Sequence, residues 1–230
     1  MEPAFWQGRW QAGQIGFHRT EVNPNLVTFA SWLDQDQPGK RLYVPLAGKS
    51  LDLLFLERRG HRVLACELVE QAVTAFFEEA SRKPEVEHAP PFEVYRGGDI
   101  TFAQGNAFEL SAEQARSMLH VAPEQAAVDG IMDRAALVAI LPADRVRYAA
   151  GLRALLTRGG RILLETLEHD ATSAPPHSVS EAEVEALFGG SFSIEKLREA
   201  DITTDSPNLT AKGATFVREK VFGLVVRDID

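Results

Sequence analysis

Short apolar runs alternate with segments of helical periodicity through most of this sequence, and this alternation constrains the fold more than any other feature. The strand-like runs lie at residues 41–46, 62–67, 99–104, 126–132 and 161–167. Helical spacing of apolar side chains predicts helices over residues 50–59, 69–82 and 144–157. Apolar strands separated by helices are typical of a mainly parallel sheet covered on both faces. The sequence therefore predicts an α/β fold.

The apolar positions of these helices indicate which side chains face the core. Three sets are expected to point inward: Leu51, Leu54 and Phe55; Ala72, Val73, Phe76 and Phe77; and Val146, Ala150, Leu152 and Leu155. Gly60 is expected to end the first helix as a left-handed cap, and Gly159 and Gly160 are expected to end the third.

The C-terminal part of the chain has a different pattern. Residues 180–188 predict a short helix with Ser180 as N-cap and Glu183 completing a capping box. Residues 192–197 and 215–226 then predict two strands with only a loop between them, which favours an antiparallel pair. The breaker-rich stretches 83–91 and 170–178 are interpreted as loops.

Length and charge exclude several classes of protein. At about 150 residues per domain, 230 residues favour a single domain, 1–230. The formal net charge of −9 argues against binding to nucleic acid, which requires a basic face. No stretch resembles a signal peptide or reaches the roughly 20 apolar residues of a membrane helix. With Cys66 as its one cysteine, the chain is expected to be a cytoplasmic monomer without disulfide or metal.

The turn after the first predicted strand contains Gly48-Lys49-Ser50, which invites comparison with a phosphate-binding loop. That loop requires another glycine five positions before Gly48, where this chain has Tyr43. A full G-x-G-x-x-G motif is also missing, so a dinucleotide pyrophosphate would lack its close backbone approach. A nucleoside triphosphate site is therefore disfavoured, and Ser50 is expected to be a helix N-cap.

Glu67 ends the second predicted strand, 19 residues after Gly48. An acidic residue about 20 positions beyond a glycine turn is placed to bind ribose hydroxyl groups. A glycine turn and this acid, without a pyrophosphate loop, favour a nucleoside cofactor that carries no phosphate. S-adenosylmethionine is the commonest such cofactor, although a charged residue at a strand end is often only solvated.

Several blocks of the chain resemble one family in the same order and at similar spacing. They are FWQGRWQAGQIGFH at 5–18, the segment from VPLAGKS to AFFEE at 44–79, MDRAALVAILPADRVRYA at 132–149, and APPHSV followed by EVEALFGG at 174–190. Together they resemble the thiopurine S-methyltransferase family. The resemblance implies S-adenosylmethionine as cofactor and a Rossmann-like sheet of seven mostly parallel strands with an antiparallel C-terminal pair.

The resemblance also implies roles for particular residues. Cofactor contacts are expected from Trp10, Leu46, Glu67 and Arg134, with Trp6, Asn106 and Ala107 in segments that border the cofactor. Phe17 matches a position next to the methyl acceptor. The chain departs from the family at Ala47, where PLCGKS usually has Cys, and at Asn106, where bacterial members usually have Asp.

Alternative interpretations accompany these residues. The aromatic side chains of residues 1–20 either anchor this segment to the core or form a lid over the cofactor, and the resemblance favours the lid. Arg134 either contacts the ligands or forms an ion pair with Asp133 or Asp144. His18 is a possible general base, but a lone histidine is more often structural.

Methyl transfer from an activated sulfonium needs positioning more than acid–base catalysis, so no catalytic side chain is expected. The implied acceptor is a small soft nucleophile: a thiopurine, another aromatic or heterocyclic thiol, or a selenium or tellurium compound. A methyltransferase acting on halide, thiocyanate or another metabolite is the alternative. Two other classes stay open, a nicotinamide-dependent oxidoreductase and a catalytically silent binding module.

Overall fold

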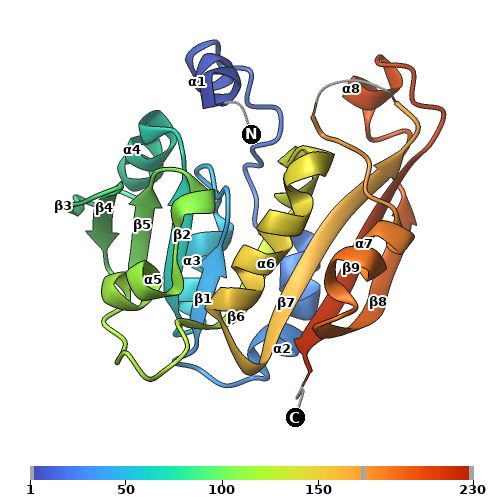
Figure 1. Cartoon of the computed structure of the whole chain (residues 1–230). Helices are drawn as coiled ribbons and strands as arrows, with labels where there is room; N and C mark the ends of the chain where they lie inside the picture. Colours follow the sequence, from blue (N-terminus) through green and yellow to red (C-terminus); the bar gives the residue numbers. More distant parts are fainter. Residues whose placement is uncertain (1–2, 172–174, 228–230) are drawn as a thin grey trace.

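A computed structural model describes residues 3–171 and 175–227, whose strands form one nine-stranded sheet. The strands are β1 (Arg41–Val44), β2 (Arg62–Glu67), β3 (Glu85–Ala89), β4 (Phe92–Gly97), β5 (Ile100–Gln104), β6 (Val128–Arg134), β7 (Leu156–His169), β8 (Phe192–Asp201) and β9 (Val217–Val226). Their order across the sheet is β3-β4-β5-β2-β1-β6-β7-β9-β8. In Figure 1 the carboxyl ends of the central strands point toward the side of the molecule on which helix α1 (Pro3–Gln11) lies.

The centre of the sheet is parallel and its two edges are antiparallel. Strands β5, β2, β1, β6 and β7 are parallel neighbours. Strand β9 runs antiparallel to β7, and β8 runs antiparallel to β9. The predicted α/β fold with an antiparallel C-terminal pair is thereby confirmed.

The opposite edge of the sheet carries a hairpin that raises the number of strands from the expected seven to nine. Residues 83–91 were expected to form a loop, and this prediction is wrong for β3, which pairs with β4 in antiparallel register. All residues of β3 except Ala89 are exposed, and Glu85 and Glu87 are charged. An edge strand of this kind lacks the apolar run that identifies a buried strand, and its charges discourage pairing with other chains.

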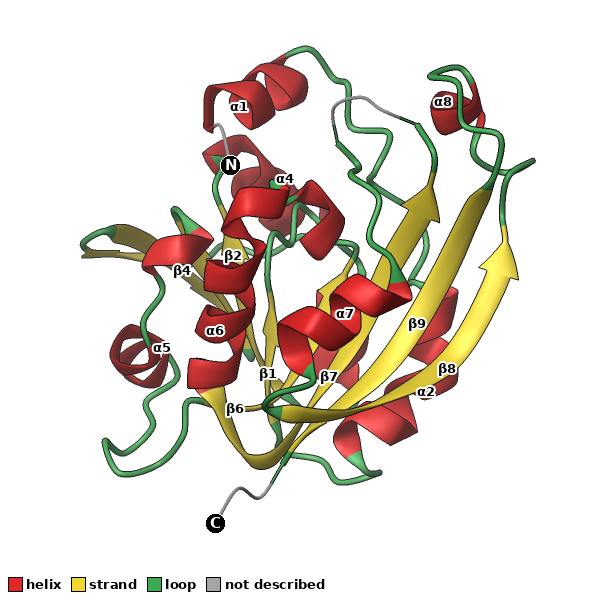
Figure 2. Cartoon of the chain, turned by 45° about the vertical axis from the view of Figure 1, so that its right-hand side comes forward, coloured by secondary structure: helices red, strands yellow, loops and turns green. Residues whose placement is uncertain are grey.

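Helices cover both faces of the sheet (Figure 2). Helices α2 (Pro24–Asp34), α3 (Asp52–Arg58) and α4 (Glu70–Glu79) pack their apolar side chains into one core. Helices α5 (Ala112–Met118), α6 (Arg145–Leu155) and α7 (Glu181–Phe188) pack into a second core on the other face. The expected inward residues of α4, from Ala72 to Phe77, are buried as predicted.

The remaining helical elements are short. They are α8 (Pro207–Thr210) and the single turns η1 (Ala107–Glu109), η2 (Leu137–Ala139) and η3 (Pro142–Asp144). In the described part of the chain, no helix is long and apolar enough to cross a lipid bilayer.

Helix α6 and the strand after it differ from expectation. Val146 is 72% exposed and Ala150 is also exposed, whereas Arg145, Tyr148 and Ala149 are buried. Leu152 and Leu155 are buried as predicted, so the expected inward face is wrong only at Val146 and Ala150. Arg145 and Tyr148 turn inward instead because they find polar partners in the interior. Gly159 and Gly160 do not end the helix: β7 begins earlier, at Leu156, and Gly159 adopts a φ of +67° inside it.

Two predicted helix caps are confirmed only in part. Helix α3 begins after Leu51, and the Ser50 hydroxyl accepts a hydrogen bond from the Asp52 N–H at 3.2 Å. The Ser180 hydroxyl accepts from the Glu183 N–H as predicted, but the Glu183 carboxylate binds Arg145 at 2.6 Å instead of completing a capping box. Gly60, with a φ of +87°, follows α3 as expected.

Candidate functional site

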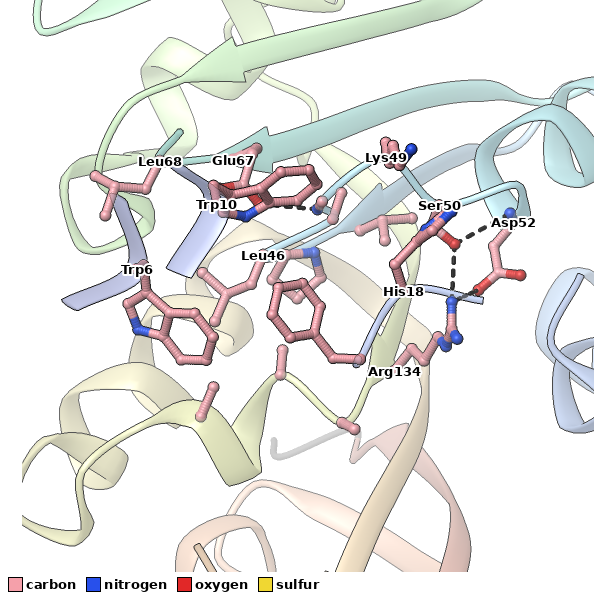
Figure 3. Close-up of a pocket in the computed structure, with 18 residues that line it drawn as sticks. Trp6, Trp10, His18, Leu46, Lys49, Ser50, Asp52, Glu67, Leu68 and Arg134 are labelled. Atoms are coloured by element: carbon pink, nitrogen blue, oxygen red, sulfur yellow. Dashed lines mark hydrogen bonds and ion pairs between the residues drawn. The ribbon is translucent and has the colours of Figure 1, made fainter. Parts of the chain in front are cut away.

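A pocket opens beyond the carboxyl ends of β1, β2 and β6, where parallel sheets of this kind bind their ligands (Figure 3). Its walls come from the N-terminal segment, the turn after β1, the end of β2, and the turn after β6. The lining residues are Trp6, Trp10, Phe17, His18, Val44 to Ser50, Asp52, Glu67, Leu68, Arg134 to Ala136, and Ala139. Six of the predicted site residues meet here: Trp6, Trp10, Phe17, Leu46, Glu67 and Arg134.

Glu67 joins the turn after β1 to the start of α4. Its Oε2 accepts a hydrogen bond from the Gly48 N–H and its Oε1 accepts one from the Val69 N–H, both at 2.8 Å. Burial raises the pKa of this carboxyl group, and the two backbone N–H groups act in the opposite direction. Each oxygen retains lone-pair capacity for a ligand hydroxyl. The Gly48 N–H is committed to a carboxylate, which explains why this turn does not form a phosphate loop.

Two turns of the pocket hold non-glycine residues in the left-handed region. Leu46 has a φ of +48° and Ala135 has a φ of +52°. Such conformations cost about 1–3 kcal/mol each and concentrate at functional sites, where the surrounding structure holds them in place. Both residues line the pocket.

Three aromatic side chains of the N-terminal segment pack edge to face above the pocket. The ring centroids of Trp6 and Phe17 are 5.7 Å apart, and those of Trp10 and Phe17 are 6.0 Å apart. Trp10 is 5% exposed and packs against Val69 and Ala72, whereas Phe17 is 43% exposed. One aromatic residue therefore anchors the segment while another presents its ring at the mouth of the pocket.

Arg134 is held in place by residues from the turn after β1 and from α3. Its Nη1 donates to the Ser50 hydroxyl at 3.1 Å and lies 3.4 Å from the Asp52 carboxylate, which is fully buried (Figure 3). Asp52 is neither of the ion-pair partners considered from the sequence. The sequence does not indicate this pairing, because Asp52 is distant from Arg134 in sequence.

Asp133 serves the backbone rather than its neighbour Arg134. Its Oδ1 accepts hydrogen bonds from the N–H groups of Ala136 and Leu137, and its Oδ2 accepts one from the Tyr148 hydroxyl at 2.8 Å. Burial raises the pKa of Asp133 to about 6. The carboxyl group thus fixes the turn that carries Arg134 and the left-handed Ala135.

Asn106 and Ala107 lie outside the lining of this pocket. The Asn106 side chain accepts a hydrogen bond from the Phe108 N–H at 3.1 Å and caps η1. Ala107 lines a second, smaller pocket with Tyr43, Phe108 and Tyr148. Their predicted contact with the cofactor stays a prediction.

A buried polar network beside the site was not predicted from the sequence. Asn23 and Asn25 donate from their amide groups to Glu165 Oε2 at 2.7 and 2.9 Å, and the Asn23 N–H donates to Asp52 Oδ1. This network ties the segment that follows the N-terminal aromatics to the end of β7. The only sequence signal was an Asn-Pro pair before a helical pattern.

Cys66 is fully buried in β2, and burial raises the pKa of its thiol, so it packs as the small apolar residue that the sequence predicts. Among the described residues, no group of three or more His, Cys, Asp and Glu side chains could hold a metal ion.

The residues of the pocket fit a nucleoside that carries no phosphate. A buried carboxylate stands where ribose hydroxyls bind in sheets of this order, and the turn that would cradle a pyrophosphate donates its N–H to that carboxylate. Leu46 and the aromatic side chains offer an apolar wall next to it. The fold and this site define a Rossmann-like enzyme of the S-adenosylmethionine-dependent methyltransferase class.

Comparisons with known proteins specify the family within that class. The sequence signature of the thiopurine S-methyltransferase family matches residues 1–227. Thiopurine S-methyltransferases from Pseudomonas putida and Pseudomonas fluorescens are each 42% identical to this chain. The first aligns over 96% of this chain and 98% of the relative, and the second over 99% and 100%. The chain belongs to the thiopurine S-methyltransferase family, and it is an S-adenosylmethionine-dependent methyltransferase.

Solved structures with low sequence identity share the fold. The 1,6-didemethyltoxoflavin-N1-methyltransferase of Burkholderia thailandensis, solved with S-adenosylhomocysteine, has a TM-score of 0.66 and 17% identity over 98% of this chain and 87% of its own. A TehB-like S-adenosylmethionine-dependent methyltransferase from Corynebacterium glutamicum has a TM-score of 0.54 and 12% identity over 96% of both chains.

Proposed function

We propose that this enzyme methylates the sulfur of a small aromatic or heterocyclic thiol such as a thiopurine, or the selenium or tellurium of a comparable soft nucleophile. The observation that carries the proposal is the composition of the pocket, in which Glu67 faces an apolar and aromatic wall. The family relationship supports the same class of acceptor, since the relatives at 42% identity are thiopurine S-methyltransferases.

Four of the seven proposed cofactor residues would contact the cofactor directly. Glu67 accepts hydrogen bonds from the ribose hydroxyl groups, and Leu46 and Trp10 cover the nucleoside with apolar surface. Arg134, which is fixed by Ser50 and Asp52, is a cation in the same pocket and can contact a carboxylate group.

Trp6 extends the aromatic wall, and aromatic faces attract a sulfonium by about 0.5–2 kcal/mol when water is excluded. Asn106 and Ala107 complete the proposed set from the neighbouring strand end.

The acceptor would lie against Phe17, whose ring is 43% exposed at the mouth of the pocket. The bound cofactor supplies a methyl group already activated for in-line displacement. The residues of this chain orient the two reactants and keep water out of the site, which can account for much of the rate enhancement.

Architecture and location are part of the proposal. The chain would be one methyltransferase domain, 1–230, in which residues 1–20 form a lid over the bound cofactor. We propose that it works as a monomer in the cytoplasm, where a reducing environment suits the free Cys66.

A substrate panel tests the proposed acceptor. The purified protein is incubated with S-adenosylmethionine and a thiopurine, a thiophenol, a selenium compound, thiocyanate or iodide, and methylated products are measured. The proposal predicts turnover of the aromatic and heterocyclic thiols, with Phe17→Ala raising KM for them about tenfold through lost ring contact. Exclusive turnover of thiocyanate or iodide would instead identify the alternative methyltransferase.

A further inference from the structure

His18 lies in the pocket on the segment that joins α1 to α2, directly after Phe17. Its backbone N–H donates to the Ile15 carbonyl at 2.8 Å, which fixes the turn that carries both residues. Within the described residues, no hydrogen bond from the protein reaches either nitrogen of the ring. The site therefore holds an imidazole with free donor and acceptor capacity.

The charged groups around His18 come from three different elements. Lys49, in the turn after β1, is paired with Glu79 of α4 at 2.5 Å. Arg134, at the end of β6, is paired with Asp52 of α3 at 3.4 Å. Figure 3 shows His18 between Ser50 and Arg134 in this view of the pocket. Each cation is paired with its own carboxylate, and among the described residues neither carboxylate forms a hydrogen bond or ion pair with the imidazole.

These surroundings keep His18 neutral. Partial burial has the largest effect and lowers its pKa, and the positive charge of Lys49 lowers it further. The negative charge of Glu79 raises the pKa by less than Lys49 lowers it, and Arg134 adds the smallest lowering effect. The pocket also contains Glu67, whose oxygens are bonded to backbone N–H groups. A neutral imidazole can accept a proton, and the neighbouring cations favour an anion produced beside it.

We propose that His18 accepts the proton of methyl acceptors that are still protonated at neutral pH, an assignment that rests on the proposed function. The thiol S–H bond breaks, its electron pair stays on sulfur, and the proton bonds to a ring nitrogen of His18. The sulfur then forms a bond to the methyl carbon while the bond from that carbon to the sulfonium breaks, leaving a neutral thioether. His18 releases its proton to solvent after the product leaves.

This role separates two kinds of acceptor. An aromatic thiol that is ionised at neutral pH needs no base, so His18 contributes little to its methylation. An arylalkyl thiol that is protonated at neutral pH needs one. The residue thus extends the acceptor range of the enzyme from acidic thiols to weakly acidic ones.

The test compares wild type, His18→Asn and the matched control His88→Asn with one thiol of each kind. His88 lies on β3 with 73% of its side chain exposed. We expect kcat/KM of His18→Asn to fall about 100-fold for the protonated thiol and to change about twofold at most for the ionised thiol. His88→Asn should match wild type with both thiols. Calorimetry with S-adenosylhomocysteine should give the same affinity for all three proteins.

A second readout does not depend on turnover. In proton NMR spectra of the protein with S-adenosylhomocysteine, the ring signal that is lost in His18→Asn reports on His18. We expect it to titrate below pH 6.5, the ordinary value, and its pKa to rise when the ionised aromatic thiol is added, because a nearby anion favours imidazolium. The His88 signal should not respond.

Each contrary result has a distinct meaning. Equal losses for both thiols, no loss for either, or an NMR signal that ignores the added thiol would overturn the role of His18 alone. If wild type binds S-adenosylhomocysteine but methylates neither thiol, the proposed function fails and the assignment falls with it. His18→Gln, tested in the same way, replaces His18→Asn if the latter does not fold.

Discussion

Glu67 and Asp133 are buried carboxyl groups at the same edge of the sheet, and their hydrogen bonds give them different tasks. Glu67 receives one backbone N–H on each oxygen and lines the pocket. Asp133 receives two backbone N–H groups and a tyrosine hydroxyl, and it lies behind the pocket rather than in its lining. The first is placed to bind a ligand, and the second supports the turn that lines the site.

The environment of Asp133 makes protein stability depend on pH. Its folded-state pKa of about 6 lies above the ordinary 3.8, so the folded protein holds this proton more tightly than the unfolded chain. The resulting stabilisation is complete below the unfolded value and is lost as pH rises from about 4 to about 6. At 1.36 kcal/mol per pKa unit, the loss is about 3 kcal/mol.

Asp133→Asn should remove this dependence, because an amide can still accept from Ala136 and Leu137 and donate to the Tyr148 oxygen. We expect the stability of Asp133→Asn relative to wild type to improve by about 3 kcal/mol between about pH 4 and pH 7.5. Urea unfolding of both proteins at the two pH values measures it. Parallel changes in the two proteins would show that Asp133 has an ordinary pKa.

At the scale of elements, helix α1 meets the rest of the protein through few side chains. Trp10 packs against Val69 and Ala72 and comes close to Gly48, while the sheet is stabilised elsewhere by two large cores. An element attached in this way can detach without unfolding the sheet. Trp10 can therefore contribute no more to the free energy of global unfolding than the free energy with which α1 docks onto the rest of the protein.

Trp10→Ala should consequently weaken cofactor binding more than it destabilises the protein. We expect the Kd for S-adenosylhomocysteine to rise about 30-fold, or 2 kcal/mol, with a loss of about 1 kcal/mol or less in unfolding free energy. Calorimetry and urea unfolding provide the two numbers. A variant that loses stability but keeps its affinity would mean that this segment only anchors itself to the core.

A close contact between α2 and β9 tests the opposite case, an element that supports the fold without touching the site. A Cβ at Gly223 would lie 2.5 Å from Cζ2 of Trp32. Gly223→Ala should lower the unfolding free energy by about 1–3 kcal/mol through overpacking and leave the affinity for S-adenosylhomocysteine unchanged. Gly151→Ala in α6, where a Cβ meets nothing within 4 Å, is the control and should not destabilise. Equal stability of the two variants would contradict the contact.

Over the whole molecule, the helices and strands that can be predicted from the sequence are those whose burial requires an apolar pattern. Strand β2 and helix α4 were predicted because their apolar residues follow the period of the element. Strand β3 escaped prediction because an exposed edge strand needs no apolar pattern, whereas β4 buries Phe92, Val94 and Tyr95 and was missed despite this pattern. The inward face of α6 was predicted correctly at Leu152 and Leu155 but not at its start, where buried Arg145 and Tyr148 are stabilised by polar partners that the sequence does not reveal.

In the site, too, residues placed by a local pattern can be predicted, whereas pairings between distant segments cannot. Glu67 and Leu46 follow strands directly, so a parallel sheet brings them to one edge. The partner of Arg134 and the network of Asn23, Asn25 and Glu165 join segments distant in sequence. Those pairings depend on how segments distant in sequence pack together, which no local pattern encodes.

The central claim is that this fold binds S-adenosylmethionine through Glu67. Calorimetric titration of wild type and Glu67→Ala with S-adenosylhomocysteine tests it most directly, with the exposed Glu87→Ala of β3 as control. Wild type and the control should bind with equal affinity, and Glu67→Ala should bind about 30-fold or more weakly through the loss of charged hydrogen bonds. No binding to wild type, or the same affinity for Glu67→Ala, would contradict the account.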